Sequence, residues 1–169
     1  MSVFSIVPFL DFDGVLHADA VYRTRHGLEL RAPGKLMMHA PILVDLLQDF
    51  PAVRIVLSTS WVRLLSYHRA RNYLPPELQA RTISATWHSR MLRSPIEGYD
   101  SLTRHEQIRA AVTRSGITRW LAIDDDPDYS WPAGDTRLVR CKPSQGLGNA
   151  QTQAELRTKL QQLVSTVVV

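Results

Sequence analysis

Residues 6–14 read Ile-Val-Pro-Phe-Leu-Asp-Phe-Asp-Gly, an apolar run that ends in two aspartates and a glycine. The run predicts a buried strand. Because residues i and i+2 of a strand point to the same side, Asp11 and Asp13 are expected to leave it together. Gly14 lets the backbone turn sharply where a side chain would obstruct it. Two such carboxylates need a neutralising partner, and Mg²⁺ prefers oxygen ligands. The alternative is a solvated Asp-x-Asp turn that caps a strand.

Two more apolar runs end in polar groups that can bind a cation or a phosphate. Residues 53–57 lead into Ser58-Thr59-Ser60-Trp61, and residues 120–123 lead into Asp124-Asp125-Asp126-Pro127-Asp128. Ligands of open α/β sheets bind outside the carboxyl ends of the strands, so three such ends together indicate one site. Each end also has a simpler interpretation. Residues 124–128 could be an acidic turn, and residues 58–60 a helix N-cap, although helix N-termini bind anions too.

The chain alternates predicted strands with predicted helices, which indicates a parallel sheet covered on both faces. Pro8 cannot donate to a ladder and predicts a bulge or an edge contact in the first strand. Thr103 with Glu106 fits a capping box, and Gly116 fits a C-cap. Strands are expected at 4–12, 53–57, 82–86, 120–123 and 137–141, and helices at 41–50, from about 60, from 101 or 103 to 115, and at 152–164.

Two segments have more particular expectations. Residues 17–35 show no helical stripe, and an alternating Leu28-Glu29-Leu30 predicts a hairpin-like flap over the site. The helix that starts near Ser60 is expected to carry Trp61, Leu64, Leu65 and His68 along one side. The Gly146-Leu147-Gly148 stretch lacks the full phosphate-binding pattern and is interpreted as a turn.

Composition fits a single domain over residues 1–169, long enough to bury a core. No apolar run approaches the ~20 residues of a membrane span. The opening ten residues lack a positive n-region, so we interpret them as a strand and not as a signal peptide. One cysteine, Cys141, excludes an intrachain disulfide and fits a reducing cytosol, so a cytoplasmic protein without membrane association is expected.

The net charge of +4 comes almost wholly from arginine. A basic balance suits anionic partners such as phosphorylated substrates or nucleic acid. A genomic bias toward arginine codons would explain the same composition without any functional meaning.

Three motifs resemble motifs one, two and four of the haloacid dehalogenase-like (HAD) hydrolases. They are Asp-Phe-Asp-Gly-Val-Leu at 11–16, Leu-Ser-Thr-Ser-Trp at 57–61 and Ala-Ile-Asp-Asp at 122–125. Ser-Thr-Ser-Trp and the Leu-Pro-Pro-Glu-Leu at 74–78 also resemble small HAD domains associated with RNA-repair proteins. The resemblance implies an α/β fold with a three-layer, Rossmann-like parallel sheet and helices on both faces. The gaps between motifs leave room for a small flap but no large cap domain, and an open site of this kind can accept a large substrate.

The resemblance also implies roles for the residues at these strand ends. Asp11 would be the nucleophile that forms an aspartyl-phosphate, and Asp13 the general acid/base whose backbone carbonyl also helps to bind Mg²⁺. Ser58, followed by Thr59, would bind the transferring phosphoryl group. The remaining metal ligand would be Asp125 or the adjacent Asp124, with Asp125 the first choice, while Asp126 and Asp128 are expected to be solvated or capping.

One expected element departs from the family pattern. HAD enzymes usually place a lysine ahead of motif four, but no lysine lies between residues 58 and 124. Arg104, at the start of the preceding helix, is in the matching place, with Arg109 and Lys142 as alternatives. An arginine offers bidentate geometry to phosphate where lysine offers a point charge. His17, just past motif one, is a candidate for contact with the leaving group.

A Mg²⁺-dependent phosphomonoesterase is therefore the favoured function. A nucleotide or nucleic-acid end is slightly ahead of sugar or metabolite phosphates as the substrate, and no obligate protein partner is indicated. One alternative is a binding or regulatory module that holds Mg²⁺ and phosphate without turnover, and another is a phosphotransferase with a non-water acceptor. The Asp11–Asp13 pair argues against the module, because a module without catalysis has no need for an acid/base.

Overall fold

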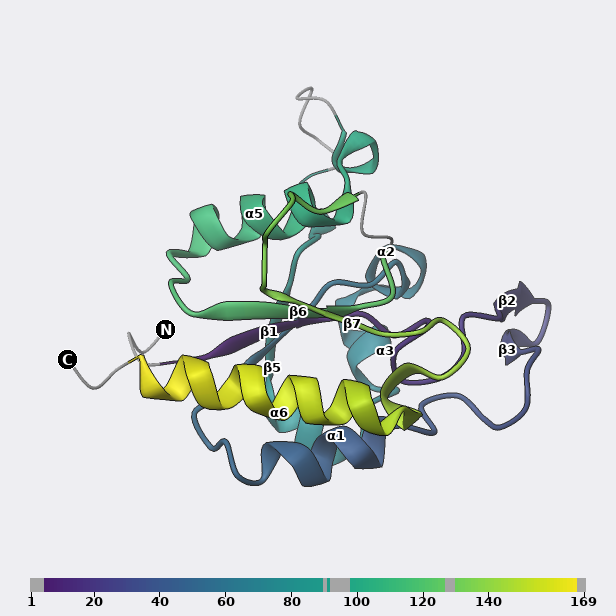
Figure 1. Ribbon diagram of the computed structural model, residues 1–169. Coiled ribbons are helices and arrows are strands. Elements are labelled where there is room, and N and C mark those ends of the chain that lie inside the picture. Colours follow the sequence, from purple (N-terminus) through teal and green to yellow (C-terminus); the bar gives the residue numbers. More distant parts are fainter. Residues whose placement is uncertain (1–4, 90, 92–97, 127–129, 167–169) are drawn as a thin grey trace.

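A five-stranded parallel sheet forms the centre of the protein, with helices on both of its faces (Figure 1). The computed structural model describes residues 5–89, 91, 98–126 and 130–166. The three-layer α/β architecture expected from the sequence is thereby confirmed. The strand order is β5-β4-β1-β6-β7, formed by Thr82–Ala85, Ile55–Leu57, Val7–Leu10, Trp120–Asp124 and Leu138–Arg140 respectively.

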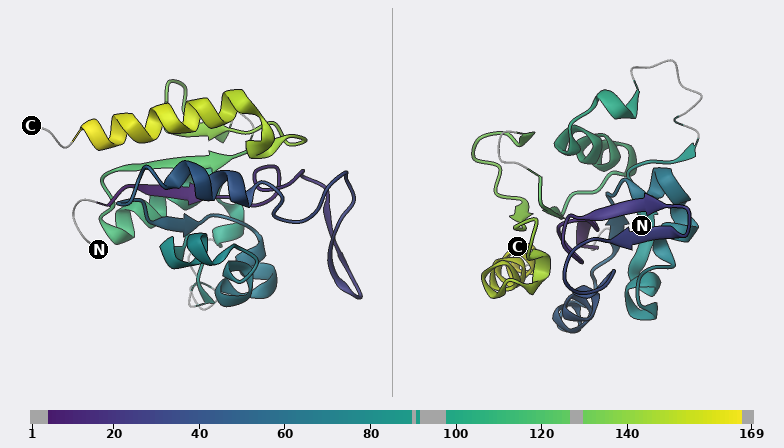
Figure 2. Two further views of the ribbon diagram at one scale, coloured as in Figure 1. Left: turned by 90° about the horizontal axis from the view of Figure 1, so that it is seen from below. Right: turned by 90° about the vertical axis from the view of Figure 1, so that its right-hand side faces the viewer.

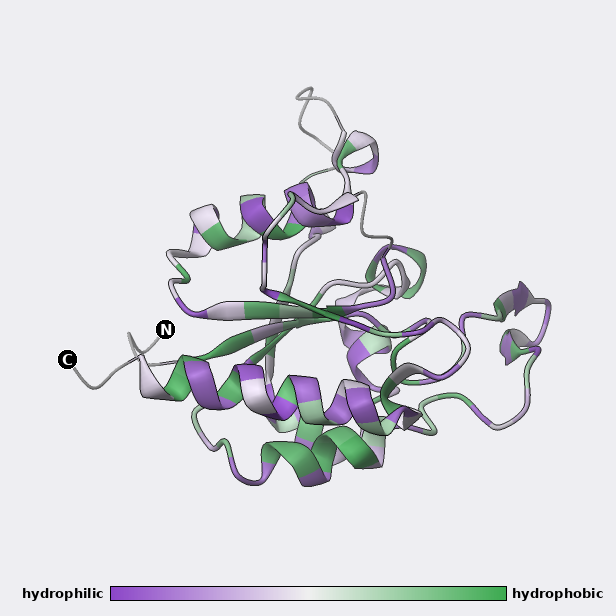
Figure 3. Ribbon diagram, in the orientation of Figure 1, coloured by the Kyte–Doolittle hydropathy of each residue, from purple (hydrophilic) through white to green (hydrophobic). Residues whose placement is uncertain are grey.

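The strands send alternate apolar side chains to opposite faces of the sheet, as a period of two requires. Val7 and Phe9 of β1 belong to a core cluster with Ile108 of α5. Ile6 and Leu10 belong to the opposite cluster, which the other helices cover. Figure 3 shows the apolar strands between the two layers. The helices are α1 (Ala40–Leu47), α2 (Trp61–Leu65), α3 (Tyr67–Arg71), α4 (Pro76–Arg81), α5 (Arg104–Ser115) and α6 (Ala150–Ser165), with short 3-10 turns at η2 (Tyr99–Ser101) and η4 (Gly146–Gly148).

Pro8 lies in the central strand, opposite Leu121 of β6, so the expectation of an edge position is wrong. Odd-numbered amides of β1 donate toward β6, as the amide of Val7 does at 3.0 Å. Pro8 therefore lacks only the donor that would face β4. On that side the pairing is interrupted between an isolated bridge at Ile6 and the ladder that resumes at Phe9.

The ends of α5 are those that the sequence predicted. The Thr103 hydroxyl accepts a hydrogen bond from the Glu106 amide at 3.3 Å, and the Glu106 carboxylate accepts one from the Thr103 amide at 2.7 Å. This reciprocal capping box satisfies two amides of the first turn. At the other end Gly116 has a φ of 62°, in the left-handed region that C-caps favour.

The single helix expected from Ser60 is divided into α2 and α3, so that prediction is wrong in part. The break is at Ser66, whose φ is 101° and whose hydroxyl accepts a hydrogen bond from the Arg69 amide. Serine competes for backbone hydrogen bonds and favours such caps over helix interiors. Leu64, expected on the same side of the helix as Trp61, is 49% exposed, whereas Trp61 is buried.

The flap expected over residues 17–35 is present as a two-stranded antiparallel hairpin. Its strands are β2 (Val21–Thr24) and β3 (Gly27–Leu30), and they project beyond the carboxyl ends of the central strands (Figure 2). No large cap domain is present in the described part of the chain.

η4 forms the turn expected at residues 146–148 and packs against the loop that follows β1. The amide of Leu147 donates to the carbonyl of Val15 at 2.9 Å. Gly146 has a φ of 50°, and a Cβ at that position would lie 2.2 Å from the same carbonyl oxygen. Only glycine permits this approach, so the carboxyl-terminal third of the chain supports the loop that carries Asp13.

Candidate active site

The winding of the sheet reverses beside β1, and the expected site residues meet there. From β1 the chain runs outward to β4 and β5, and then crosses to β6 and β7 on the other side. Ligands of open α/β sheets bind at this kind of switch point, outside the carboxyl ends of the strands. Asp11 directly follows β1, Ser58 follows β4, and Asp124 ends β6. The Asp11 amide donates to the carbonyl of Ile123 at 3.1 Å, which keeps the ends of β1 and β6 in register.

Three carboxylates lie together at this edge. One ligand atom from each of Asp11, Asp124 and Asp125 falls within 4.8 Å of the others. Asp11 and Asp124 are buried, and burial raises the pKa of each, with mutual repulsion adding to the effect at Asp124. Burial and the neighbouring charge of Asp11 also raise the pKa of Asp125 to about 7. The cluster therefore disfavours its own ionised form unless a cation balances it.

Arg104 supplies one positive charge to the cluster. Its Nη2 lies 3.4 Å from Asp11 Oδ2, and its Nε lies 3.2 Å from Asp124 Oδ2. Burial alone would lower the pKa of Arg104, but the charges of the two aspartates outweigh it and raise that pKa. Neither alternative cation contacts these carboxylates within the described residues, since Arg109 and Lys142 have exposed side chains.

One guanidinium does not balance three carboxylates, and the remaining oxygens suit a hard divalent cation. Asp124 Oδ2 contacts Arg104 but makes no hydrogen bond within the described chain, although it is buried. Oxygen-only ligands from carboxylates are the set that Mg²⁺ takes. The residues present therefore fit a magnesium ion held by Asp11, Asp124 and Asp125.

Asp13 is held by two N–H donors. Trp61 Nε1 donates to Asp13 Oδ2 at 2.8 Å, and His17 Nε2 lies 3.1 Å from Asp13 Oδ1. The amide of Met37 donates to the other ring nitrogen of His17 at 3.3 Å, so in the neutral ring the proton is on Nε2, facing Asp13. Met37 itself has a φ of 60°, in a region that non-glycine residues rarely adopt. Asp13 is thus fixed in orientation and lies outside the carboxylate cluster.

Ser58 and Thr59 form the remaining side of the site. Ser58 is fully buried, yet its hydroxyl makes no hydrogen bond to any described residue. A buried hydroxyl without a partner is costly, which makes Ser58 a candidate to bind a ligand. Thr59 is also buried and lines a pocket of about 240 Å³. The other residues that line this pocket are Ser60, Arg63, Tyr99, Arg104, Gln107 and Asp126.

Asp126, the acidic residue that follows Asp125, has structural contacts. Asp126 donates its amide to Asp124 Oδ1 at 3.1 Å and accepts a hydrogen bond from the Ser130 hydroxyl at 2.5 Å. It is half-buried and helps to shape the turn. Asp128 lies outside the described residues.

Three features of the site were not predicted from the sequence. Trp61 was expected on one side of a helix, and it packs edge-to-face on Phe12, but its indole N–H also donates to Asp13. His17 was a candidate for contact with the leaving group, and its contact with Asp13 was not predicted. Tyr99 lines the 240 Å³ pocket, with its hydroxyl 2.6 Å from Thr86 Oγ1. No sequence spacing links these side chains, because each comes from a different element.

The order of the strands and the carboxylate cluster at the switch point define a Rossmann-like α/β domain. A family model described as the HAD domain in Swiss Army Knife RNA repair proteins matches residues 7–152, and the chain belongs to this family. No curated protein and no solved structure matched the chain. Among the described residues, no helix is both long and apolar enough to cross a bilayer.

Gly14 provides the first test of this geometry. Its φ is 68°, and an added Cβ would lie 2.1 Å from Asp125 Oδ2. We expect Gly14→Ala to displace the Asp125 carboxylate and to weaken Mg²⁺ binding at least tenfold in calorimetric titration. The left-handed backbone adds a loss of stability of about 1 kcal/mol.

Gly116→Ala is the matched control for this variant. Gly116 has a similar φ of 62°, but nothing lies within 4 Å of an added Cβ. It should lose similar stability in thermal unfolding and keep the affinity for Mg²⁺. Equal Mg²⁺ affinity in both variants would contradict the proposed closeness of Gly14 and Asp125.

Proposed function

We propose that the protein is a Mg²⁺-dependent phosphomonoesterase that works through an aspartyl-phosphate on Asp11, with nucleic-acid ends or nucleotides as its substrates. The observation that carries the proposal is the meeting of Asp11, the unpartnered Ser58 hydroxyl and the Asp124–Asp125 pair at one switch point. Bound Mg²⁺ would neutralise charge at the nucleophile and on the phosphate. Asp11, Asp124 and Asp125 would hold it.

In the first half-reaction a carboxylate oxygen of Asp11 attacks phosphorus, and the bond from phosphorus to the ester oxygen breaks. Asp13 donates its proton to that departing oxygen. The Ser58 hydroxyl donates a hydrogen bond to the transferring phosphoryl group, and Arg104 adds positive charge beside the nucleophile.

In the second half-reaction Asp13, now ionised, takes a proton from water as that water attacks phosphorus. The bond from phosphorus to Asp11 breaks, which releases inorganic phosphate and restores both carboxyl groups to their initial states. The fixed orientation of Asp13 suits this double role, because its two hydrogen bonds hold the carboxyl group in place through both proton transfers.

The test is phosphate release from a substrate panel with and without Mg²⁺. The panel contains an aryl phosphate, mononucleotides, sugar phosphates, and oligonucleotides phosphorylated at either end. We expect release that requires Mg²⁺ and is fastest with a nucleic-acid end. If folded, Mg²⁺-loaded protein releases phosphate from none of them, the site is instead a binding module or serves a non-water acceptor.

Trp61→Phe tests whether the indole N–H positions Asp13. Phenylalanine keeps a ring against Phe12 but removes the donor to Asp13 Oδ2, so we expect kcat to fall about tenfold with little change in KM. Steady-state kinetics with an alkyl phosphate measures the split between kcat and KM.

Trp131→Phe is the control for the loss of a buried indole. Trp131 is buried against His105 under α5, and its Nε1 has no hydrogen-bond partner among the described residues. It should leave kcat unchanged. An equal fall in both variants would mean that Trp61 acts through packing and not through Asp13.

A further inference from the structure

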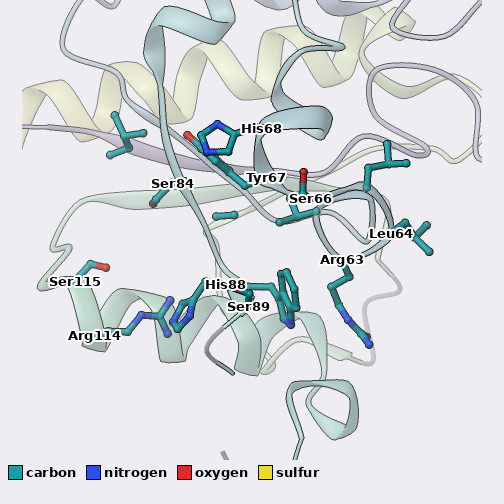
Figure 4. A pocket seen from close by; sticks show the side chains of 15 residues that line it. Arg63, Leu64, Ser66, Tyr67, His68, Ser84, His88, Ser89, Arg114 and Ser115 are labelled. Atoms are coloured by element: carbon teal, nitrogen blue, oxygen red, sulfur yellow. The ribbon is translucent and has the colours of Figure 1, made fainter. Parts of the chain in front are cut away.

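A second pocket lies beside the candidate active site and has no role in the proposed chemistry. Its volume is about 710 Å³, within the range of ligand-binding pockets. It is formed by α2, the start of α3, the edge strand β5, the segment after β5 and the end of α5 (Figure 4). β5 is an edge strand of the sheet, so among the described strands only β4 pairs with it.

The lining of this pocket combines aromatic rings with positive charge. Tyr67, Trp87, His68 and His88 supply rings, and no described lining residue carries a carboxylate. The two arginines of the pocket, Arg63 and Arg114, lie at opposite ends of it, with His88 and Ser89 between them (Figure 4). The lining therefore favours a ligand that has both flat apolar surfaces and negative charge.

Arg114 is available to such a ligand. It is exposed, and its described contact is a hydrogen bond of 3.2 Å from Nη2 to the carbonyl oxygen of Thr86, which leaves its charge without a carboxylate partner in the described chain. Arg63 differs, because it is ion-paired with the exposed side chain of Asp100. Trp87 is half-buried, so part of its ring packs on the core and part faces the pocket.

The pocket adjoins the smaller pocket that Thr59 and Arg104 line, because the two share one lining residue. Arg63 lines both the 710 Å³ pocket and the 240 Å³ pocket that also contains Arg104. Helix α5 contributes to both pockets. Arg104, at its start, lines the smaller pocket, and Arg114, near its end, lines the larger one. At a rise of ~1.5 Å per residue, these arginines are about 15 Å apart along the helix. This distance is longer than a sugar monophosphate. It suits a polymer chain that extends away from the reacting phosphate.

We propose that this pocket binds the single-stranded nucleic-acid segment next to the terminal phosphate, with a base stacked on Trp87 and a backbone phosphate at Arg114. Unpaired bases stack on aromatic side chains without regard to sequence, and arginines contact the phosphates. The inference rests on the proposed function and deepens it. It names an oligonucleotide, and not a mononucleotide or sugar phosphate, as the substrate class.

The kinetic test compares an oligonucleotide with a terminal phosphate and a small aryl phosphate as substrates of the same enzyme. We expect Trp87→Ala and Arg114→Gln each to lower the ratio of their kcat/KM values, oligonucleotide to aryl phosphate, by about tenfold. Trp87→Phe should recover most of the loss, because phenylalanine also stacks. Arg157→Gln removes the same charge from α6, on the far side of the sheet, and should leave the ratio unchanged.

The binding test needs no turnover. A fluorescent, phosphorylated single strand is titrated with Asp11→Asn protein in Mg²⁺ at several salt concentrations, and its anisotropy is measured. Adding Arg114→Gln should weaken binding and reduce the slope of log affinity against log salt by about 0.7, the value for one lost phosphate contact. Arg114 is exposed, so this variant is informative even if Trp87→Ala fails to fold.

The outcomes separate this proposal from the proposed function. If the wild type hydrolyses aryl phosphate while the pocket variants change neither the ratio nor the salt slope, the pocket proposal is overturned and the phosphatase stands. The pocket would then serve another occupant, such as a strand of a partner protein added to β5. If nothing is hydrolysed but the pocket variants lose the salt-dependent binding, the nucleic-acid site stands and the phosphatase fails.

Discussion

Asp11→Asn is expected to abolish phosphate release, with a fall in kcat of at least about 10⁴-fold. The amide is a far poorer nucleophile than the carboxylate, and loss of a nucleophile that acts with an acid/base removes nearly all of the chemical advantage. Turnover of an aryl phosphate under saturating Mg²⁺ measures the loss.

The same variant should be more stable than the wild type when Mg²⁺ is absent. Three carboxylates share one guanidinium, and burial disfavours the ionised form of Asp11, so removing one negative charge relieves repulsion. Thermal unfolding should show a rise of a few degrees in Tm without Mg²⁺ and a smaller gain from added Mg²⁺ than in the wild type. A variant that retains turnover would eliminate Asp11 as the nucleophile, whatever its stability.

Asp13→Asn should have the second largest effect, and its size should depend on the leaving group. General acid–base catalysis contributes about 10²- to 10⁴-fold, and its acid half matters most when the departing oxygen is basic. We expect kcat to fall about 10³-fold with an alkyl phosphate and clearly less with a nitrophenyl phosphate. The comparison of the two substrates is the measurement.

Mg²⁺ affinity provides the control for Asp13→Asn. The Asp13 side chain lies outside the cluster of Asp11, Asp124 and Asp125, so calorimetric titration should give an unchanged affinity. The amide also meets two donors, Trp61 and His17, and can accept from only one of them. Equal losses with both leaving groups would point to this local disturbance and not to a missing proton donor.

Much of the fold could be predicted because the deciding signals are local. The apolar runs of β1 and β6, the Thr103–Glu106 capping box and the Gly116 C-cap are each readable within a few residues. The errors came at two single residues whose effect on the backbone the apolar pattern does not show. Pro8 is tolerated in the central strand because its missing donor faces a gap in the β4 pairing, and Ser66 divides a helix because its own hydroxyl caps the second half.

Some parts of the candidate site could likewise be predicted from the sequence, and others could not. The carboxylates could be predicted because they follow buried strands, and parallel strands bring their ends together. The sequence could not decide whether Asp124 or Asp125 is the metal ligand, because the two residues are adjacent. The structure places both in the cluster. The donors to Asp13 could not be predicted either, since Trp61 and His17 reach it from separate elements, and His17 is oriented by Met37 across twenty residues of chain.

The contact between Gly146 and Val15 has a consequence for the timing of activity during synthesis. The loop after β1 is synthesised well before η4, yet its carbonyl at Val15 accepts a hydrogen bond from the amide of Leu147, close to the start of α6. A nascent chain that has not yet extended past η4 therefore has its nucleophile but lacks the support that fixes the loop. Catalytic competence should therefore appear only after η4 has been synthesised, and a chain truncated after residue 145 should be inactive.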